Sequence, residues 1–149
     1  MKLRIPHDAW VLVGDGRKAL VLRNEGDEVY PNLKTEQVFQ APFNPATHDQ
    51  GSDSPGRAFQ SVGARRSAVS QTDWHTIAEH RFAQEVAAAI EAAHRAKRVR
   101  ALVVVAPPRT LADLRASLSS DVKGMIIAEI DKDLTKHPVH EIERLLTAG

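Results

Sequence analysis

Acidic side chains are the first groups in this sequence that could do chemistry. Carboxylates that converge at strand ends can hold two divalent ions and clamp a phosphodiester for cleavage. The predicted positions argue against such a site, because Asp15 belongs to an Asp-Gly turn and the strand ending at Ala106 carries no acid. The remaining candidates, on a solvated helix or in a turn after the last strand, are Glu79, Glu85, Asp131 and Asp133. We therefore expect no working nuclease site.

Histidine, serine and cysteine offer little more. The seven histidines form no His-Glu-x-x-His motif, and an ordinary helix start explains His137 and His140 more simply than a shared metal ion. No Gly-x-Ser-x-Gly segment marks a nucleophilic serine, and the absence of cysteine excludes thiolate catalysis. We predict no catalytic residue, no metal and no cofactor. The alternative is a hydrolase that uses His75 or the pair Asp131 and Asp133.

Arginine and lysine gather in two places and are the better candidates for binding. Arg95, Lys97, Arg98 and Arg100 close a long predicted helix, where they could meet RNA phosphates or simply complement the helix dipole. Aromatic residues make up only 5% of the chain, so no base-stacking platform supports the RNA interpretation there. A second group lies in a long loop, where arginine has less structural reason to occur, and consists of Arg57, Arg65 and Arg66.

The composition is that of an ordinary globular chain. Its 149 residues suit one domain, and 42% hydrophobic with 26% charged residues excludes a disordered protein. The 20 Lys and Arg against 19 Asp and Glu leave no basic arm or acidic tail that would dictate a partner. The sequence starts without an apolar leader, and its longest apolar run, residues 101–108, is too short to cross a bilayer. We expect a cytoplasmic protein without a membrane partner.

Three antiparallel strands are predicted first. Residues 9–13 and 17–23 are short apolar runs joined by Gly14-Asp15-Gly16, a hairpin signal in which glycine would adopt the positive φ of a tight turn. A looser strand covers residues 28–39, and Pro31 indicates that it begins late or lies at an edge. The long loop that follows, residues 40–66, is rich in Pro, Gly, Asp and Ser, a composition typical of a functional or mobile segment.

Two helices are predicted from capping-box spacings. Ser70 with Asp73 opens a long helix that carries one apolar stripe and ends near Lys97. Thr110 with Asp113 repeats the spacing and opens a shorter helix.

The order of the elements predicts an α/β fold. Residues 100–106 form an apolar strand suited to a central position, residues 125–130 form the fifth strand, and Pro138 opens the first turn of a last helix. The second half is therefore a βαβ unit with parallel strands. Three antiparallel strands joined to this unit predict a single ribonuclease-H-like domain over residues 1–149, with a mixed five-stranded sheet and helices on both faces. Unpaired sheet edges would allow a homo-oligomer.

Four short motifs in order resemble the bacterial host attachment protein family. They are residues 10–19 (Trp-Val-Leu-Val-Gly-Asp-Gly-Arg-Lys-Ala), residues 54–59 (Ser-Pro-Gly-Arg-Ala-Phe), residues 106–115 (Ala-Pro-Pro-Arg-Thr-Leu-x-x-Leu-Arg) and residues 129–136 (Glu-Ile-Asp-Lys-Asp-Leu-Thr-Lys), followed by Pro138. The resemblance spans nearly the whole chain. It implies similarity to the middle domain of archaeal and eukaryotic peptide-chain release factors, which has a ribonuclease-H-like fold.

The release-factor likeness implies a ribosome- or tRNA-associated role, but one motif is missing. Those factors place Gly-Gly-Gln in the loop before the long helix, whereas this chain has Gly56-Arg57-Ala58-Phe59-Gln60 and Gly63-Ala64-Arg65-Arg66. We therefore predict a non-catalytic binding protein of the ribosome or RNA, linked indirectly to attachment to host cells. The alternative hydrolase would act on a nucleic acid or tRNA ester. The predicted binding residues are Arg57, Gln60, Arg65, Arg66, Arg95, Lys97, Arg98 and Arg109.

Overall fold

A mixed five-stranded sheet forms the centre of the computed structural model, which describes the backbone of residues 2–41 and 60–148 and the side chains of 2–41 and 74–148. The strands are β1 (Trp10–Gly14), β2 (Lys18–Asn24), β3 (Leu33–Gln40), β4 (Leu102–Ala106) and β5 (Ile126–Asp131). They are ordered β3-β2-β1-β4-β5. The first three pair antiparallel, and β4 runs parallel to both β1 and β5. The predicted α/β class and sheet are confirmed.

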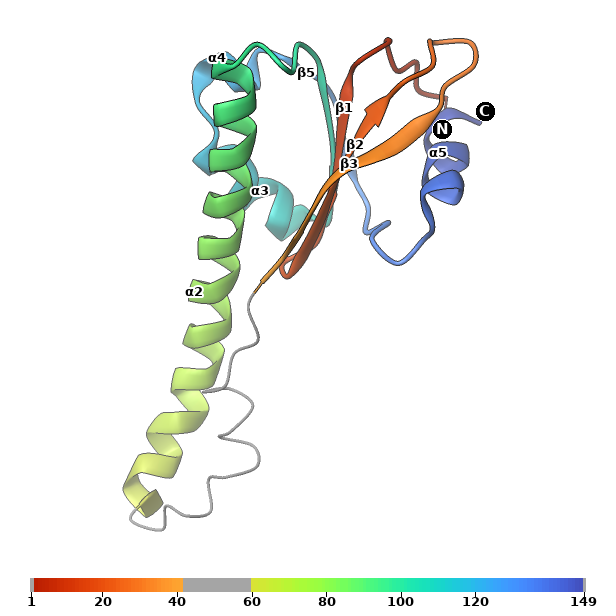
Figure 1. The fold of residues 1–149 in the computed structure, drawn as a ribbon. Coiled ribbons are helices and arrows are strands. Elements are labelled where there is room, and N and C mark those ends of the chain that lie inside the picture. Colours follow the sequence, from red (N-terminus) through yellow and green to blue (C-terminus); the bar gives the residue numbers. More distant parts are fainter. Residues whose placement is uncertain (1, 42–59, 149) are drawn as a thin grey trace.

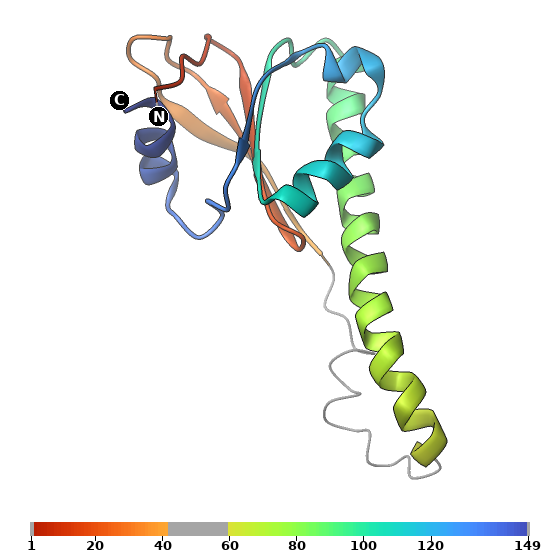
Figure 2. The same cartoon turned by 180° about the vertical axis from the view of Figure 1, so that it is seen from behind.

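Helices cover both faces of the sheet, as predicted (Figures 1 and 2). They are α2 (Gln60–Arg95), α3 (Pro108–Ser117), α4 (Ser120–Lys123) and α5 (Val139–Thr147). The helices α2, α3 and α4 lie on one face, and α5 lies on the other beside both ends of the chain. One apolar core forms under each group, so β1 and β4 are buried along their whole length. The uninterrupted apolar runs of these strands follow from burial on both faces.

The long helix begins earlier than predicted. The capping-box prediction at Ser70 and Asp73 is wrong, because α2 begins at Gln60 and includes both residues. Residues 60–66 are therefore helical, and the predicted loop 40–66 is too long at both ends, since Gln40 belongs to β3. No proline interrupts residues 60–73, so the chain can continue the helix through a spacing that resembles a start. The N-terminal part of α2 extends beyond the sheet (Figure 2).

The second capping-box prediction is also wrong. Pro107 is the N-cap of α3 and offers no side-chain acceptor, and Pro108 occupies the first helical position, where its missing N–H costs nothing. Asp113 is instead an ion-pair partner of His80 on α2. In the last helix Pro138 is likewise the N-cap and not a residue of the first turn.

The hairpin between β1 and β2 forms as predicted but for a different local reason. No described glycine has a positive φ, so the expected role of Gly16 is wrong. The Asp15 carboxylate closes the turn by accepting the backbone N–H groups of Arg17 and Lys18, each at 2.7 Å. A Cβ at position 16 would lie 2.8 Å from the Glu79 carboxylate, so the end of this side chain on α2 would have to move aside.

Candidate functional site

The C-terminal end of α2 has an unusual cap that presents a cation. Lys97 has φ 59, in the left-handed region that usually holds glycine. The Arg98 N–H donates to the carbonyl of Ala93, and the Lys97 N–H donates to that of His94, each at 2.9 Å. These two bonds form a Schellman motif, which satisfies carbonyls that the helix end would leave unpaired. The cap holds the backbone of Lys97, and its side chain is exposed.

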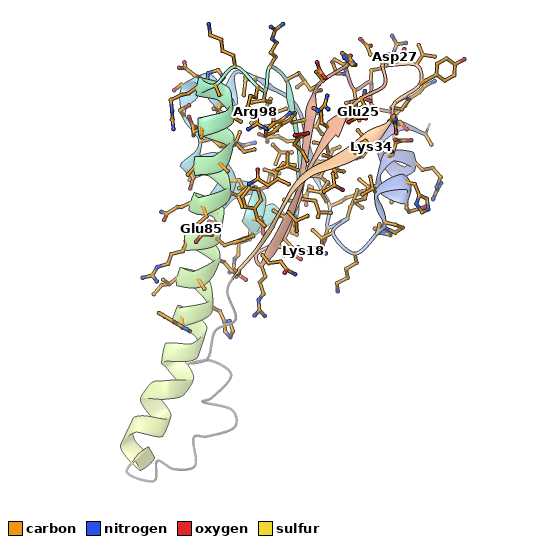
Figure 3. The ribbon with its side chains drawn as sticks, in the orientation of Figure 1. Lys18, Glu25, Asp27, Lys34, Glu85 and Arg98 are labelled. Atoms are coloured by element: carbon orange, nitrogen blue, oxygen red, sulfur yellow. The ribbon has the colours of Figure 1, made fainter. Side chains whose placement is uncertain are left out.

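The side chain of Arg98 contacts other side chains of the same protein. Its guanidinium Cζ lies 5.9 Å from the centre of the Trp10 ring, and its Nη2 lies 3.7 Å from Oε2 of Glu36 on β3. Glu36 also accepts Arg23 Nε at 3.1 Å, and the pKa of Arg23 is raised by its hydrogen bonds to Glu36 and Asp8. Figure 3 shows Arg98 between the end of α2 and the sheet. Its position has a structural explanation, so it is the weakest of the predicted binding residues.

Other cations at the same end have no such explanation. Arg95, Lys97 and Arg100 are exposed, and within the described side chains none of them has an ion-pair or hydrogen-bond partner. Lys123, at the end of α4, is exposed in the same way, and α4 lies beside the end of α2 (Figure 1). We call these four residues the α2-end cations. The nearby Glu91 is occupied by hydrogen bonds from the Ser119 N–H and hydroxyl.

The remaining predicted binding residues do not join this group. Arg109 is exposed in the first turn of α3, after β4 ends, whereas the α2-end cations lie where β4 begins. Gln60, Arg65 and Arg66 belong to the backbone of α2, more than six helical turns from Arg95 at roughly 3.6 residues a turn. Arg57 lies outside the described residues. The prediction therefore combined residues from opposite ends of the fold.

The acids after β5 have structural partners. Thr135 is buried, and its hydroxyl lies 2.7 Å from Asp133 Oδ1 and 3.1 Å from Asp15 Oδ2. The pKa of Asp133 is lowered: burial acts to raise it, and the hydrogen bonds from Thr135 outweigh that effect. This contact joins the β1–β2 hairpin to the segment that leads to α5. Asp133 therefore has a structural partner in Thr135.

An ion pair connects α2 with α3. His80 Nδ1 lies 2.9 Å from Asp113 Oδ1, an ion pair that links the two helices when the histidine is protonated. The adjoining cavity, lined by Gly16, Glu79 and Asp113 among others, has a volume of only about 10 Å³. That is room for about one water molecule. Among the described residues, no three His, Asp or Glu side chains are placed to hold a metal ion.

The turn between β2 and β3 has an organisation that was not predicted from the sequence. Asn24 is fully buried, and its amide group makes five hydrogen bonds. Nδ2 donates to the carbonyls of Ile5, Pro6 and Asp27, and Oδ1 accepts the N–H groups of Gly26 and Asn32. The Asp27 carboxylate accepts the N–H groups of Val29 and Tyr30. The sequence does contain one signal of a special turn here, because Val29 and Tyr30 are an isolated apolar pair among turn residues.

The fold and the site define a small α/β protein with a group of exposed cations, unpaired within the described side chains, at the end of its long helix. The sequence model of the family described as "protein required for attachment to host cells" matches residues 10–146. The chain therefore belongs to the host attachment family, as its motifs predict. No curated protein matches it. None of the helices in the described ranges combines the length and apolar character needed to cross a membrane.

Proposed function

We propose that this host attachment protein is a non-catalytic, cytoplasmic binding protein that associates with RNA or with the ribosome through the α2-end cations. The observation that carries the proposal is the exposure of Arg95, Lys97 and Arg100 without partners in the described structure. Phosphate groups are the ligands that such a set of exposed, charged side chains binds most readily.

The conformation of Lys97 supports a role for its charge. A non-glycine residue in the left-handed region costs about 1 kcal/mol or more, and glycine would remove this cost. Strain of this kind is common where a side chain has a function. In this proposal the strained cap places a lysine between Arg95 and Arg100.

The acidic side chains that could serve catalysis have partners within the protein, whereas the α2-end cations have none in the described structure. Asp15 and Asp133 hold Thr135, while Asp113 holds His80. The candidate hydrolase residues are His75 and the pair Asp131 and Asp133. Within the described side chains, no hydrogen bond or ion pair joins any of them to another. The hydrolase alternative thus has no supporting contact.

The strand order agrees with a ribonuclease-H-like domain, which we propose for residues 1–149. Three antiparallel strands followed by β4 and β5, with β1 parallel to β4, match the expected arrangement. The likeness to the middle domain of release factors belongs to the same proposal. A host attachment phenotype would then be an indirect consequence of binding to the translation machinery.

Cosedimentation with purified ribosomes tests the proposal. The test variant combines Arg95→Gln, Lys97→Gln and Arg100→Gln, and the matched control combines Arg17→Gln, Lys132→Gln and Lys136→Gln. The control removes the same number of positive charges from exposed residues that follow the C-terminal ends of β1 and β5, away from the α2-end cations. We expect the test variant alone to lose binding, with a slope of log affinity against log salt that is smaller by roughly 2 to 3. Equal binding by both variants would contradict the assignment of the site.

A further inference from the structure

The turn between β2 and β3, residues 25–32, is rigid in its backbone and exposed at its tip. Its backbone is held by Asn24 and Asp27, and a Cβ on Gly26 would lie 2.1 Å from the Tyr30 carbonyl oxygen. Yet the side chains of Val29 and Tyr30 are 73% and 79% exposed. A rigid aromatic tip loses little conformational entropy on binding, which is the property of an anchor in a protein–protein contact. We call residues 27–30 the turn tip.

An open concavity of about 690 Å³ lies directly beside this tip. The N-terminal segment forms one side with Lys2, Leu3 and Arg4, and the turn itself forms another with Glu28 and Val29. The Leu3 N–H donates to the carbonyl of Leu146 at 2.9 Å, which fixes the N-terminal segment against α5. Lys2 and Arg4 are exposed and have no ion-pair partner among the described residues, and the same holds for Glu28.

We propose that the chain forms a two-fold symmetric dimer in which the turn tip of each copy enters the concavity of the other. The concavity is lined on one side by Lys2 and Arg4 of the N-terminal segment and on another by Asp27 and Glu28 of the tip. A two-fold contact requires one surface that is complementary to itself. A basic side and an acidic side meet that condition, because each copy supplies both and a two-fold axis places the acidic tip of one copy against the basic side of the other.

The position of the turn tip makes this contact compatible with RNA binding at the α2-end cations. Figure 3 shows Asp27 at the far side of the sheet from α2. The dimer would leave Arg95, Lys97 and Arg100 exposed, so this inference goes beyond the proposed function and does not depend on it.

The edges of the sheet are less suitable for self-association. The pairing of β3 with β2 shifts its register between Val21 and Leu22, and the edge strand β3 includes the charged residues Lys34 and Glu36. The pairing of β5 with β4 shifts between Leu102 and Val103, which leaves Ile127 unpaired. Bulges and charges at an edge strand hinder the addition of another strand. The turn tip is therefore the surface to which we assign the dimer.

Sedimentation velocity of the full chain over a range of concentrations, at low salt, tests the dimer. Tyr30→Ala removes the anchor, and Ile127→Ala is the matched control because Ile127 is also a large exposed apolar residue but lies on the opposite edge strand. We expect Tyr30→Ala to raise the dimer dissociation constant by about tenfold or more, as loss of an interface anchor does. Ile127→Ala should leave it unchanged.

A charge exchange makes the test specific. Arg4→Glu and Glu28→Arg should each weaken the dimer, and the double variant should restore it, because each copy then presents the reversed pair. A wild-type chain that stays monomeric at every concentration would overturn the proposal. So would a dimer that Ile127→Ala disrupts while Tyr30→Ala does not. Unchanged circular dichroism of the variants shows that each remains folded.

Discussion

Thr135 and Asp15 are 120 positions apart in the chain, and the buried Thr135 hydroxyl lies 3.1 Å from the Asp15 carboxylate. The other oxygen of Asp15 closes the β1–β2 hairpin, so a single carboxylate connects the first turn of the sheet with the segment after the last strand.

Replacing Thr135 should destabilise the fold. Thr135→Val keeps the volume but removes a hydroxyl shared by two carboxylates, so we expect the free energy of unfolding to fall by about 1 to 3 kcal/mol. Thr147→Val is the control, because the Thr147 hydroxyl bonds only to a carbonyl of its own helix. Urea unfolding measures both. A Thr135→Val protein as stable as the control would contradict the structural role of the contact.

Glycine at position 97 should make the protein more stable. Lys97→Gly relieves the left-handed strain at the end of α2, and we expect a gain of about 1 kcal/mol in the free energy of unfolding. Ala96→Gly, one residue earlier, has no positive φ to relieve and should cost stability. Thermal unfolding compares the two variants. If Lys97→Gly also weakens ribosome binding, stability and function are opposed at this residue, as the proposal requires.

Asn24 should be one of the most sensitive polar residues. Asn24→Ala leaves several buried backbone groups without partners, and we expect the free energy of unfolding to fall by about 3 kcal/mol. The control is Asn32→Ala, because the Asn32 side chain is exposed and its loss should cost less than about 0.5 kcal/mol. Equal effects of the two changes in denaturant titration would refute the view that Asn24 organises the turn.

The turn tip should loosen in acid. Hydrogen bonds from the backbone of Tyr30 and Val29 lower the pKa of Asp27 below its ordinary value of 3.8. A carboxyl whose pKa is depressed by folding stabilises the folded turn fully above its unfolded pKa, and this contribution is lost as the pH falls through the folded pKa. Nuclear magnetic resonance should therefore show the Asp27 carboxyl and the Tyr30 amide titrating together below pH 3.8. Titration of the carboxyl at 3.8 or above would be inconsistent with these bonds.

The sheet could be predicted because its signals are local. Apolar runs such as residues 102–106 fix a strand by themselves, and Pro31 correctly indicated that β3 begins late, at Leu33. Helix starts were harder to predict. A capping-box spacing describes only a few residues, and it fails when the preceding chain is able to continue the helix, as it does before Ser70.

The site could be predicted only in part, because partner choice depends on contacts between distant segments. Arg98 and Lys97 are neighbours with the same charge, yet Arg98 pairs with Glu36 on β3 and Lys97 does not. The burial of Asn24 could not be predicted from the sequence either, because its partners include Ile5 and Pro6, which lie far earlier in the chain. Composition and spacing carry no information on these pairings.

Ribosome cosedimentation at low salt tests the central claim most directly, because contacts with phosphate are strongest there. The account predicts that the wild-type chain and the Arg17, Lys132 and Lys136 control both sediment with ribosomes, and that the variant lacking Arg95, Lys97 and Arg100 stays in the supernatant. Absence of the wild-type chain from the ribosomal pellet at low salt would contradict the account.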